Sequence, residues 1–248
     1  MQAIILAAGY ATRLSPLTDN LPKALLPIGG ETMLDHLVDS ILSIGEIARM
    51  TVVTNEKFHL QFEEWAAGRR DDRIAVLNDG TTLNGERLGA IGDIDFTVRS
   101  MGIDGDCLIV AGDNYLTIDM RAFYRQYMDI GRKPLLLAQR TDDLDMLRRF
   151  GVASIDEAGR VTKLVEKPQE PESDLAVFAL YLYPREVIRR LPEYMASGRS
   201  VDSPGNFSQW LSEIGDVYIH VTERPCFDIG THETLAEVRA RAAKGEFR

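Results

Sequence analysis

Hydrophobic residues along this chain follow two alternating patterns, which predict strands and helices in succession. Short, nearly continuous apolar runs are typical of buried strands, and they occupy residues 2–6, 50–55, 73–78, 106–113 and 134–139. Apolar residues at helical spacing separate these runs and predict helices at residues 32–45, 57–67, 88–101 and 119–130. Thr32 suits the N-cap of the first helix, and Gly45 suits its end. This alternation favours a parallel sheet with helices on both faces.

The pattern changes after about residue 140. Shorter β segments are predicted at residues 151–156, 157–167 and 174–184. Helices follow at 184–191 and 206–214, then strands at 217–222 and 225–230, and a final helix at 231–244. We therefore expect one α/β domain over residues 1–248. Its core would be a Rossmann-like mixed, mostly parallel sheet with helices on both faces, and a smaller β-rich portion would pack on the first half.

Composition and charge restrict the classes of partner. Apolar residues make up 45% of the 248 positions and charged residues 27%, which is ordinary for a globular protein. The 28 basic and 38 acidic residues give a net charge of −10. This balance disfavours a nucleic acid or an anionic membrane as partner, because either requires a basic surface. Small phosphorylated ligands remain compatible, since they need only a few local cations.

The chain carries no sequence signal for export or membrane insertion. Its first residues, MQAIILAAG, lack the basic segment of a signal peptide, and no apolar run is long enough to span a bilayer. The two cysteines, Cys107 and Cys226, are far apart and lack metal-ligand spacing. We therefore expect a protein of the reducing cytoplasm. The pattern leaves open whether it forms a homo-oligomer.

A long loop with isolated cations follows the first strand. Gly9 permits a close backbone approach to an anion, and Thr12 adds a hydroxyl donor. Arg13 offers two parallel N–H groups to phosphate oxygens, and Lys23 adds a second positive charge. Together these residues could bind a polyphosphate, although a solvated loop with incidental charges has the same composition. The Walker A pattern is absent.

Two acids and an acid–cation pair occupy the ends of other predicted strands. Asp113 ends an apolar strand, and Asp228 lies alone in the apolar segment PCFDIGT. Such acids need a compensating cation, but Asp113 also suits a turn and Asp228 a helix N-cap. Glu166 and Lys167 end a third β segment, just before a proline. Folding alone would bring these groups together at the carboxyl ends of strands, where ligands bind in open sheets.

In this order the motifs resemble those of the sugar-1-phosphate nucleotidylyltransferases, also called nucleotide-sugar pyrophosphorylases. The run LAAGYATRLSPLT at residues 6–18, followed by PKALLP at 22–27, is similar to that family's opening signature. Further similarities are GD at 112–113, FGV at 150–152, EKP at 166–168 and FDIGT at 227–231. The resemblance covers essentially the whole chain. It implies that residues 1–140 bind a nucleotide, and that residues 141–248 bind a sugar phosphate and include the C-terminal helix.

The resemblance also implies a role for each matching residue. Arg13 and Lys23 would bind the triphosphate, while Asp113 and Asp228 would hold Mg²⁺. Lys167 would bind the phosphate of a sugar 1-phosphate. Residues implied as catalytic are thus Arg13, Lys23, Asp113 and Lys167. Nucleotide contacts would come from Leu6, Ala8, Gly9, Thr12, Arg13, Lys23 and Asp113, and sugar contacts from Gly151, Glu166 and Lys167.

Two positions depart from the family's pattern. Ala11 stands where the family often has glycine. The segment NDGTTLNGERLGAIGDI at 78–94 only loosely matches the stretch that contacts the base. Asn78 and the backbone of Gly89 are our candidates for base and ribose contacts. The identity of the base therefore stays open.

The implied reaction joins a nucleoside triphosphate to a sugar 1-phosphate and releases pyrophosphate. A phosphate dianion needs no general base, so the four histidines are assigned no catalytic role. One alternative is a cytidylyltransferase that acts on a non-sugar phosphate such as phosphocholine. Another is a non-catalytic regulatory subunit that binds a nucleotide sugar. We expect no second, acyltransferase-type activity, because the chain has no C-terminal repeat of that type.

Overall fold

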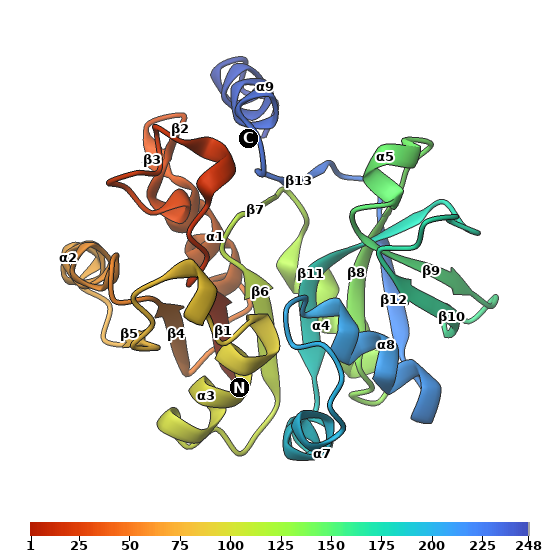
Figure 1. Cartoon of the computed structure of the whole chain (residues 1–248). Coiled ribbons are helices and arrows are strands. Elements are labelled where there is room, and N and C mark those ends of the chain that lie inside the picture. Colours follow the sequence, from red (N-terminus) through yellow and green to blue (C-terminus); the bar gives the residue numbers. More distant parts are fainter. Residues whose placement is uncertain (248) are drawn as a thin grey trace.

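β1 (Gln2–Leu6) lies near the middle of the large sheet, between two strands that run parallel to it. The computed structural model describes residues 1–247 (Figure 1). The parallel neighbours of β1 are β4 (Arg49–Thr54) and β6 (Cys107–Ala111), and β5 (Ile74–Asn78) extends the sheet beyond β4. Residues 3–5 are fully buried, as the continuous apolar run predicts for a strand covered on both faces.

A second group of strands joins this sheet through one long antiparallel strand. β11 (Leu175–Tyr183) pairs antiparallel with β6, and it joins β8 (Leu135–Arg140), β9 (Gly151–Ile155), β10 (Val161–Glu166) and β12 (Tyr218–Thr222) to the sheet. Within residues 1–247 the sheet has nine strands, in the order β10-β9-β11-β6-β1-β4-β5, with β8 and β12 off that path. The predicted mixed α/β sheet is confirmed, and its antiparallel pairings arise mainly from β11.

The helices follow the predicted ranges closely in all but one region. Those of the first half are α1 (Met33–Leu42), α2 (His59–Arg69), α3 (Ala90–Met101) and α4 (Met120–Asp129). Those of the second half include α8 (Gly205–Ile214) and α9 (His232–Ala243). Short elements not predicted are β2 (Pro27–Ile28), β3 (Glu31–Thr32), β7 (Asn114–Leu116) and the helix α5 (Leu144–Leu147). β13 (Cys226–Asp228) falls within the predicted segment 225–230.

The single helix predicted at 184–191 covers one short helix and the first residue of another. The chain forms two short helices there, α6 (Arg185–Ile188) and α7 (Leu191–Ala196). Pro192 lies in the first turn of α7. Proline lacks the N–H that a continuous helix would require at this position, but it is well tolerated at a helix start. The chain therefore ends one helix and begins another.

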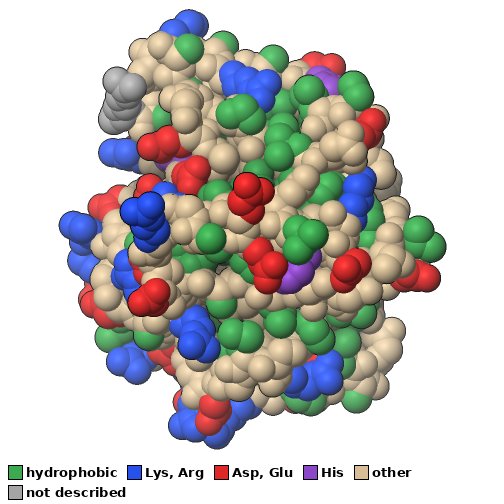
Figure 2. Space-filling view, turned by 90° about the vertical axis from the view of Figure 1, so that its left-hand side faces the viewer, with side chains coloured by type: hydrophobic (Ala, Val, Ile, Leu, Met, Phe, Trp, Pro, Cys, Tyr) green, Lys and Arg blue, Asp and Glu red, His purple; other side chains and the backbone are tan. Residues whose placement is uncertain are grey.

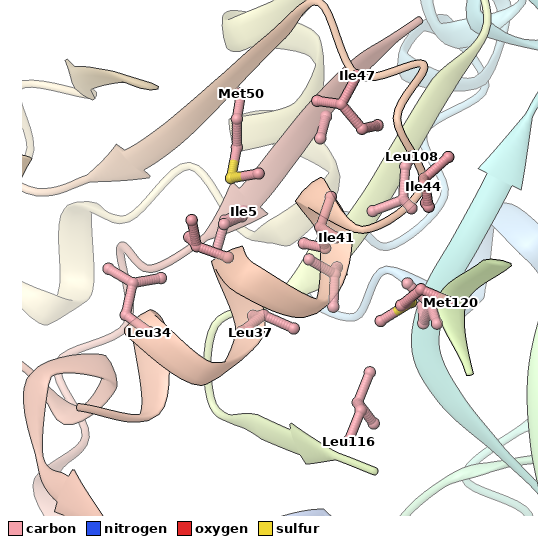
Figure 3. Packing of buried hydrophobic residues seen from close by; sticks show 14 of the residues in the cluster. Ile5, Leu34, Leu37, Ile41, Ile44, Ile47, Met50, Leu108, Leu116 and Met120 are labelled. Atoms are coloured by element: carbon pink, nitrogen blue, oxygen red, sulfur yellow. The ribbon is translucent and has the colours of Figure 1, made fainter. Parts of the chain in front are cut away.

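Apolar layers cover both faces of the sheet. On one face Leu34, Leu37 and Ile41 of α1 point toward Ile5 and Met50 of the strands (Figure 3). On the other face the side chains of α3, α7 and α8 form a second cluster around β6 and β11. The parallel strands are thus buried on both sides, and polar chemistry is restricted to the strand ends.

The C-terminal helix holds the long N-terminal loop in place. In Figure 1, α9 lies above β2 and β3, and its Leu235 and Val238 pack on buried residues of that loop, including Leu14. Arg239 Nε donates to the carbonyl of Pro27 at 2.9 Å. The two ends of the chain therefore form one unit around the loop that follows β1.

The surface carries charges of both signs. On the face shown in Figure 2, acidic and basic side chains alternate without a continuous area of either sign. This face therefore provides no basic footprint for a polyanion. Among residues 1–247, every helix is too short or too polar to cross a bilayer.

Candidate active site

Two adjoining cavities open at the carboxyl ends of β1 and β6. The loop-side cavity, of about 410 Å³, is lined by Gly9, Thr12, Arg13 and Lys23, among others. The β11-side cavity, of about 330 Å³, is lined by Gly89, Gly151, Glu166, Lys167 and Asp228, among others. Leu6, Gly9 and Asp113 line both cavities. Most of the residues singled out in the sequence therefore lie around one continuous hollow.

A lysine joins the two acids that the sequence places far apart. Lys23 Nζ lies 2.9 Å from Asp113 Oδ2 and 3.8 Å from Asp228 Oδ1. The backbone sets this geometry, because β13 pairs antiparallel with β7 and brings Asp228 opposite Asn114. Ile229 N–H also donates to the carbonyl of Asp113 at 3.0 Å. The fold thus brings Asp113 and Asp228 together beside one cation.

Burial and mutual repulsion make Asp228 a weaker acid than usual. Burial raises the pKa of Asp228 to about 6, and the nearby Asp113 charge adds to this rise, while Lys23 and Arg13 oppose it. Arg13 lies close by: a side-chain carbon placed on Gly230 would lie 3.3 Å from Arg13 Nη2 and 3.5 Å from Asp228 Oδ2. The two acids therefore share a confined site beside Lys23 and Arg13.

The loop after β1 is held in a constrained shape. Ala11 has a left-handed backbone with φ of 47°, a conformation that costs an L-residue roughly 1–2 kcal/mol. Glycine would adopt this conformation freely. Thr18 Oγ1 donates to the carbonyl of Ala11 at 2.8 Å, and buried Asn55 donates to the carbonyl of Ala8 at 2.9 Å. These bonds stabilise the loop over the strand ends.

Glu166 and Lys167 form the opposite wall. Lys167 has φ of 50° and its N–H donates to the carbonyl of Phe150 at 3.0 Å. Its Nζ donates to Ser203 Oγ and lies 3.9 Å from Glu166 Oε1. Burial raises the pKa of Glu166, and Lys167 partly offsets this effect. The left-handed backbone turns the chain away from the strand direction at Lys167. Backbone strain of this kind is commonly found at functional sites.

The two residues proposed to contact the base have different surroundings. Gly89 lines the β11-side cavity with φ of 78°, and a side-chain carbon there would lie 2.7 Å from the carbonyl oxygen of Val201. Asn78 belongs to neither cavity lining: its Nδ2 donates to Glu56, and its Oδ1 accepts from Gly80 N–H at 2.9 Å. The close approach explains the glycine at 89, whereas a base contact by Asn78 stays a prediction.

The β11-side cavity also contains residues that the sequence analysis did not select. Asn114 is buried and donates to the carbonyl of Ala179 at 3.2 Å. Arg149 lies on the rim and faces the charge of Asp228. Ser203 accepts the Lys167 bond described above. Asn114 directly follows a predicted site residue, but Arg149 and Ser203 carry no motif that distinguishes them from ordinary surface residues.

Asp93 is a buried acid in the wall of the β11-side cavity. Only 6% of the residue is exposed, and its Oδ1 has no hydrogen-bond partner among residues 1–247. Burial, together with the nearby Asp79, raises the pKa of Asp93 to about 8. The sequence offered one indication that Asp93 is buried: it lies between Ile91 and Ile94 in a predicted helix, and both isoleucines are buried. Asp93 is therefore neutral in the folded protein below about pH 8.

Comparisons with known proteins agree with this geometry. The family described as Nucleotidyl transferase matches residues 2–245, and the chain therefore belongs to that family. A provisionally named mannose-1-phosphate guanyltransferase of Sulfolobus acidocaldarius is 29% identical over 200 residues, which are 77% of this chain and 50% of that protein. The chain thus spans about half the length of that relative.

Other relatives are matched over nearly the whole chain. A glucose-1-phosphate thymidylyltransferase of Neisseria meningitidis is 26% identical over 239 residues, which cover 96% of this chain and 81% of that protein. A crystal structure from Bacillus anthracis, provisionally described as a glucose-1-phosphate thymidylyltransferase in complex with a sucrose, superposes with a TM-score of 0.84. It is 26% identical, and the match covers 98% of this chain and 95% of that one. These relatives are named as sugar-1-phosphate nucleotidyltransferases.

The raised pKa of Asp93 generates a prediction for Asp93→Asn. In the unfolded chain this acid ionises above its ordinary pKa of 3.8, but in the folded protein only above about 8. The contribution of Asp93 to the free energy of unfolding of the wild type therefore falls as pH rises from about 4 to about 8. Asparagine does not ionise, so at pH 8 the variant should be more stable than the wild type by about 1 kcal/mol or more. Urea unfolding at several pH values measures this difference.

Asp95→Asn on the same helix is the matched control. Asp95 pairs with Arg99 at 2.9 Å, so its substitution removes an ion pair and should not stabilise the protein at pH 8. Stability curves of Asp93→Asn and the wild type that run parallel from pH 4 to 8 would contradict the prediction.

Proposed function

We propose that the chain is a sugar-1-phosphate nucleotidylyltransferase. It joins a nucleoside triphosphate to a sugar 1-phosphate, forming a nucleoside diphosphate sugar and pyrophosphate. The observation that carries the proposal is the contact of Lys23 with both Asp113 and Asp228, at the point where the two cavities meet. The loop cations lie on one side of this contact and Lys167 on the other.

The reaction brings two anions into contact, so its barrier is largely electrostatic and orientational. A phosphate oxygen of the sugar 1-phosphate attacks the α-phosphorus, and pyrophosphate leaves from the opposite side. Arg13 and Lys23 bind the triphosphate and compensate the charge that builds on the leaving pyrophosphate. Lys167 holds the attacking phosphate close despite repulsion. The phosphate dianion is already a nucleophile near neutral pH, so no side chain needs to remove a proton.

Asp113 and Asp228 suit a divalent cation. Mg²⁺ prefers oxygen ligands and is commonly held by one or two carboxylates together with substrate phosphates. Both acids converge on the position where Lys23 compensates them, and they are the residues that would hold Mg²⁺. When bound, the ion supplies Lewis-acid stabilisation of charge on the phosphates. The two carboxylates that lie together at this site fit the preference of Mg²⁺ for oxygen ligands.

The remaining cavity residues divide between the two substrates. The backbone around Leu6, Ala8 and Gly9 and the hydroxyl of Thr12 contact the nucleotide, and Gly89 lies at its base or ribose. Gly151 and Glu166 contact the sugar, since an acid beside the phosphate cation can accept hydrogen bonds from sugar hydroxyls. A polar acceptor in this position favours a sugar over phosphocholine, which has no hydroxyl groups.

A substrate panel tests the proposed function directly. ATP, CTP, GTP, UTP and dTTP are each combined with glucose 1-phosphate, mannose 1-phosphate and phosphocholine, and released pyrophosphate is measured. We expect turnover with at least one sugar 1-phosphate and none with phosphocholine. Turnover confined to CTP with phosphocholine would favour the cytidylyltransferase alternative. Binding of a nucleotide sugar without any turnover would instead favour a regulatory subunit.

Lys167→Ala tests the cation assigned to the sugar phosphate. Loss of one preorganised charge partner should lower kcat/KM about a hundredfold to a thousandfold, while the protein stays folded. Lys163→Ala is the matched control, because Lys163 lies on β10, the strand that Lys167 directly follows, and pairs with Glu172 at 2.7 Å on the exposed surface. Steady-state kinetics and circular dichroism of both variants provide the comparison. Equal activity in the two variants would remove the assigned role of Lys167.

Divalent-ion dependence tests the pair of acids. We expect excess EDTA to abolish pyrophosphate release and added Mg²⁺ to restore it, because two partly buried carboxylates and two phosphorylated substrates require positive charge. The same EDTA treatment should leave the thermal unfolding midpoint nearly unchanged, since Lys23 already compensates the acids in the fold. An unchanged rate in EDTA would show that the acids serve another purpose.

A further inference from the structure

The carboxylate of Glu166 lies between two glycines from distant parts of the chain. A side-chain carbon placed on Gly205 would lie 2.0 Å from Glu166 Oε2 and 2.7 Å from Glu166 Cδ. A side-chain carbon placed on Gly151 would lie 3.0 Å from the same Oε2. Atoms cannot approach to 2.0 Å without a bond, so the present position of Glu166 requires glycine at 205. We call this space the Glu166 notch.

Backbone conformation does not explain the glycine at 205. Ten glycines of residues 1–247 have a positive φ, and Gly205 is not one of them. Gly205 is the first residue of α8. In helix interiors glycine is less favourable than alanine by about 1 kcal/mol, so helix propensity gives no reason for glycine here. Neither a turn nor a left-handed conformation calls for glycine here. The feature of the site that requires it is the adjacent carboxylate.

Other contacts align the acid with the start of α8. Glu166 N–H donates to Gln209 Oε1 at 2.8 Å, which ties the end of β10 to the first turns of the helix. Pro204, which precedes the helix, has no side-chain cap. The carboxylate of Glu166 lies beside Gly205 at the start of α8, where the partial positive charge of a helix favours an anion. Burial raises the pKa of Glu166, and Lys167 and Ser203 oppose this rise.

We infer that Gly205 is a positioning residue that determines where Glu166 meets the sugar. This inference rests on the proposed function. A methyl group at 205 would push the carboxylate away from α8, and Gly151 already lies close on the other side. The remaining direction is into the β11-side cavity, which both Glu166 and Gly205 line. The displaced acid would then occupy space and hydrogen-bonding positions that the sugar requires.

Gly205→Ala tests this inference, with Gly215→Ala as its matched control. Gly215 lies just past the other end of α8 with an extended backbone, and a side-chain carbon there meets only Leu211 O at 4.0 Å. The assay uses whichever pair gives turnover among glucose 1-phosphate with dTTP or UTP and mannose 1-phosphate with GTP. Gly205→Ala should raise KM for the sugar 1-phosphate about tenfold to a hundredfold. KM for the triphosphate and kcat should change little, because a misplaced sugar contact weakens uniform binding. Gly215→Ala should retain wild-type constants.

A double-variant cycle separates a clash with Glu166 from general damage to α8. If the methyl group acts by displacing the carboxylate, Glu166→Ala makes room for it. The double variant should then be as thermally stable as Glu166→Ala alone. Its KM for the sugar 1-phosphate should be lower than the product of the fold-increases in the two single variants predicts. This stability readout decides the inference even if Gly205→Ala alone fails to fold.

The outcomes distinguish the inference from the proposed function. If the wild-type enzyme turns over a substrate pair and Gly205→Ala has the same KM for the sugar 1-phosphate, the inference is wrong and the proposed function still holds. Additive stability losses in the double variant overturn it as well. A wild type that turns over no pair refutes the proposed function and with it the role of Gly205 in sugar binding. Non-additive stability together with a selective rise in sugar KM supports both.

Discussion

The structure depends on the need to compensate two partly buried acids that lie far apart in the chain. Asp113 follows β6 and Asp228 ends β13, and pairing of β13 with β7 forces them into proximity. Their repulsion would oppose that pairing without a cation, and Lys23 contacts both. Because Lys23 belongs to the long loop after β1, the loop, the sheet edge and the C-terminal segment must assemble together. Packing of α9 on the loop strengthens the same arrangement.

One short segment, residues 201–205, connects the two sides of the candidate active site. The carbonyl of Val201 accepts from Ile91 N–H at 2.9 Å, at the start of the helix that follows Gly89. Ser203 accepts from Lys167, and Gly205 leaves room for Glu166. A shift of this segment would therefore change the contacts of α3, Lys167 and Glu166 together.

The sequence predicted the strands and most helices well because they are buried on both faces or have clear apolar periodicity. It was less accurate at residues 184–191, where the predicted helix ends early as α6 and a second helix, α7, begins at Leu191 with Pro192 in its first turn. The loop motif, Asp113, Lys167 and Asp228 could be selected because charged residues at apolar strand ends are conspicuous. Asp93 was missed because a single acid inside an amphipathic pattern resembles an ordinary exposed helix residue.

The sequence by itself determined the order of most strands and helices, the acidic net charge and the presence of a loop suited to phosphates. These properties follow from local composition and periodicity, which depend on neighbours in the chain. Only the tertiary structure decided that Lys23 lies between two aspartates, that Asp93 is buried beside Asp79, and that Glu166 rests against Gly205. Each of these contacts joins residues whose spacing along the chain carries no information about their distance, because sheet pairing and helix packing set that distance.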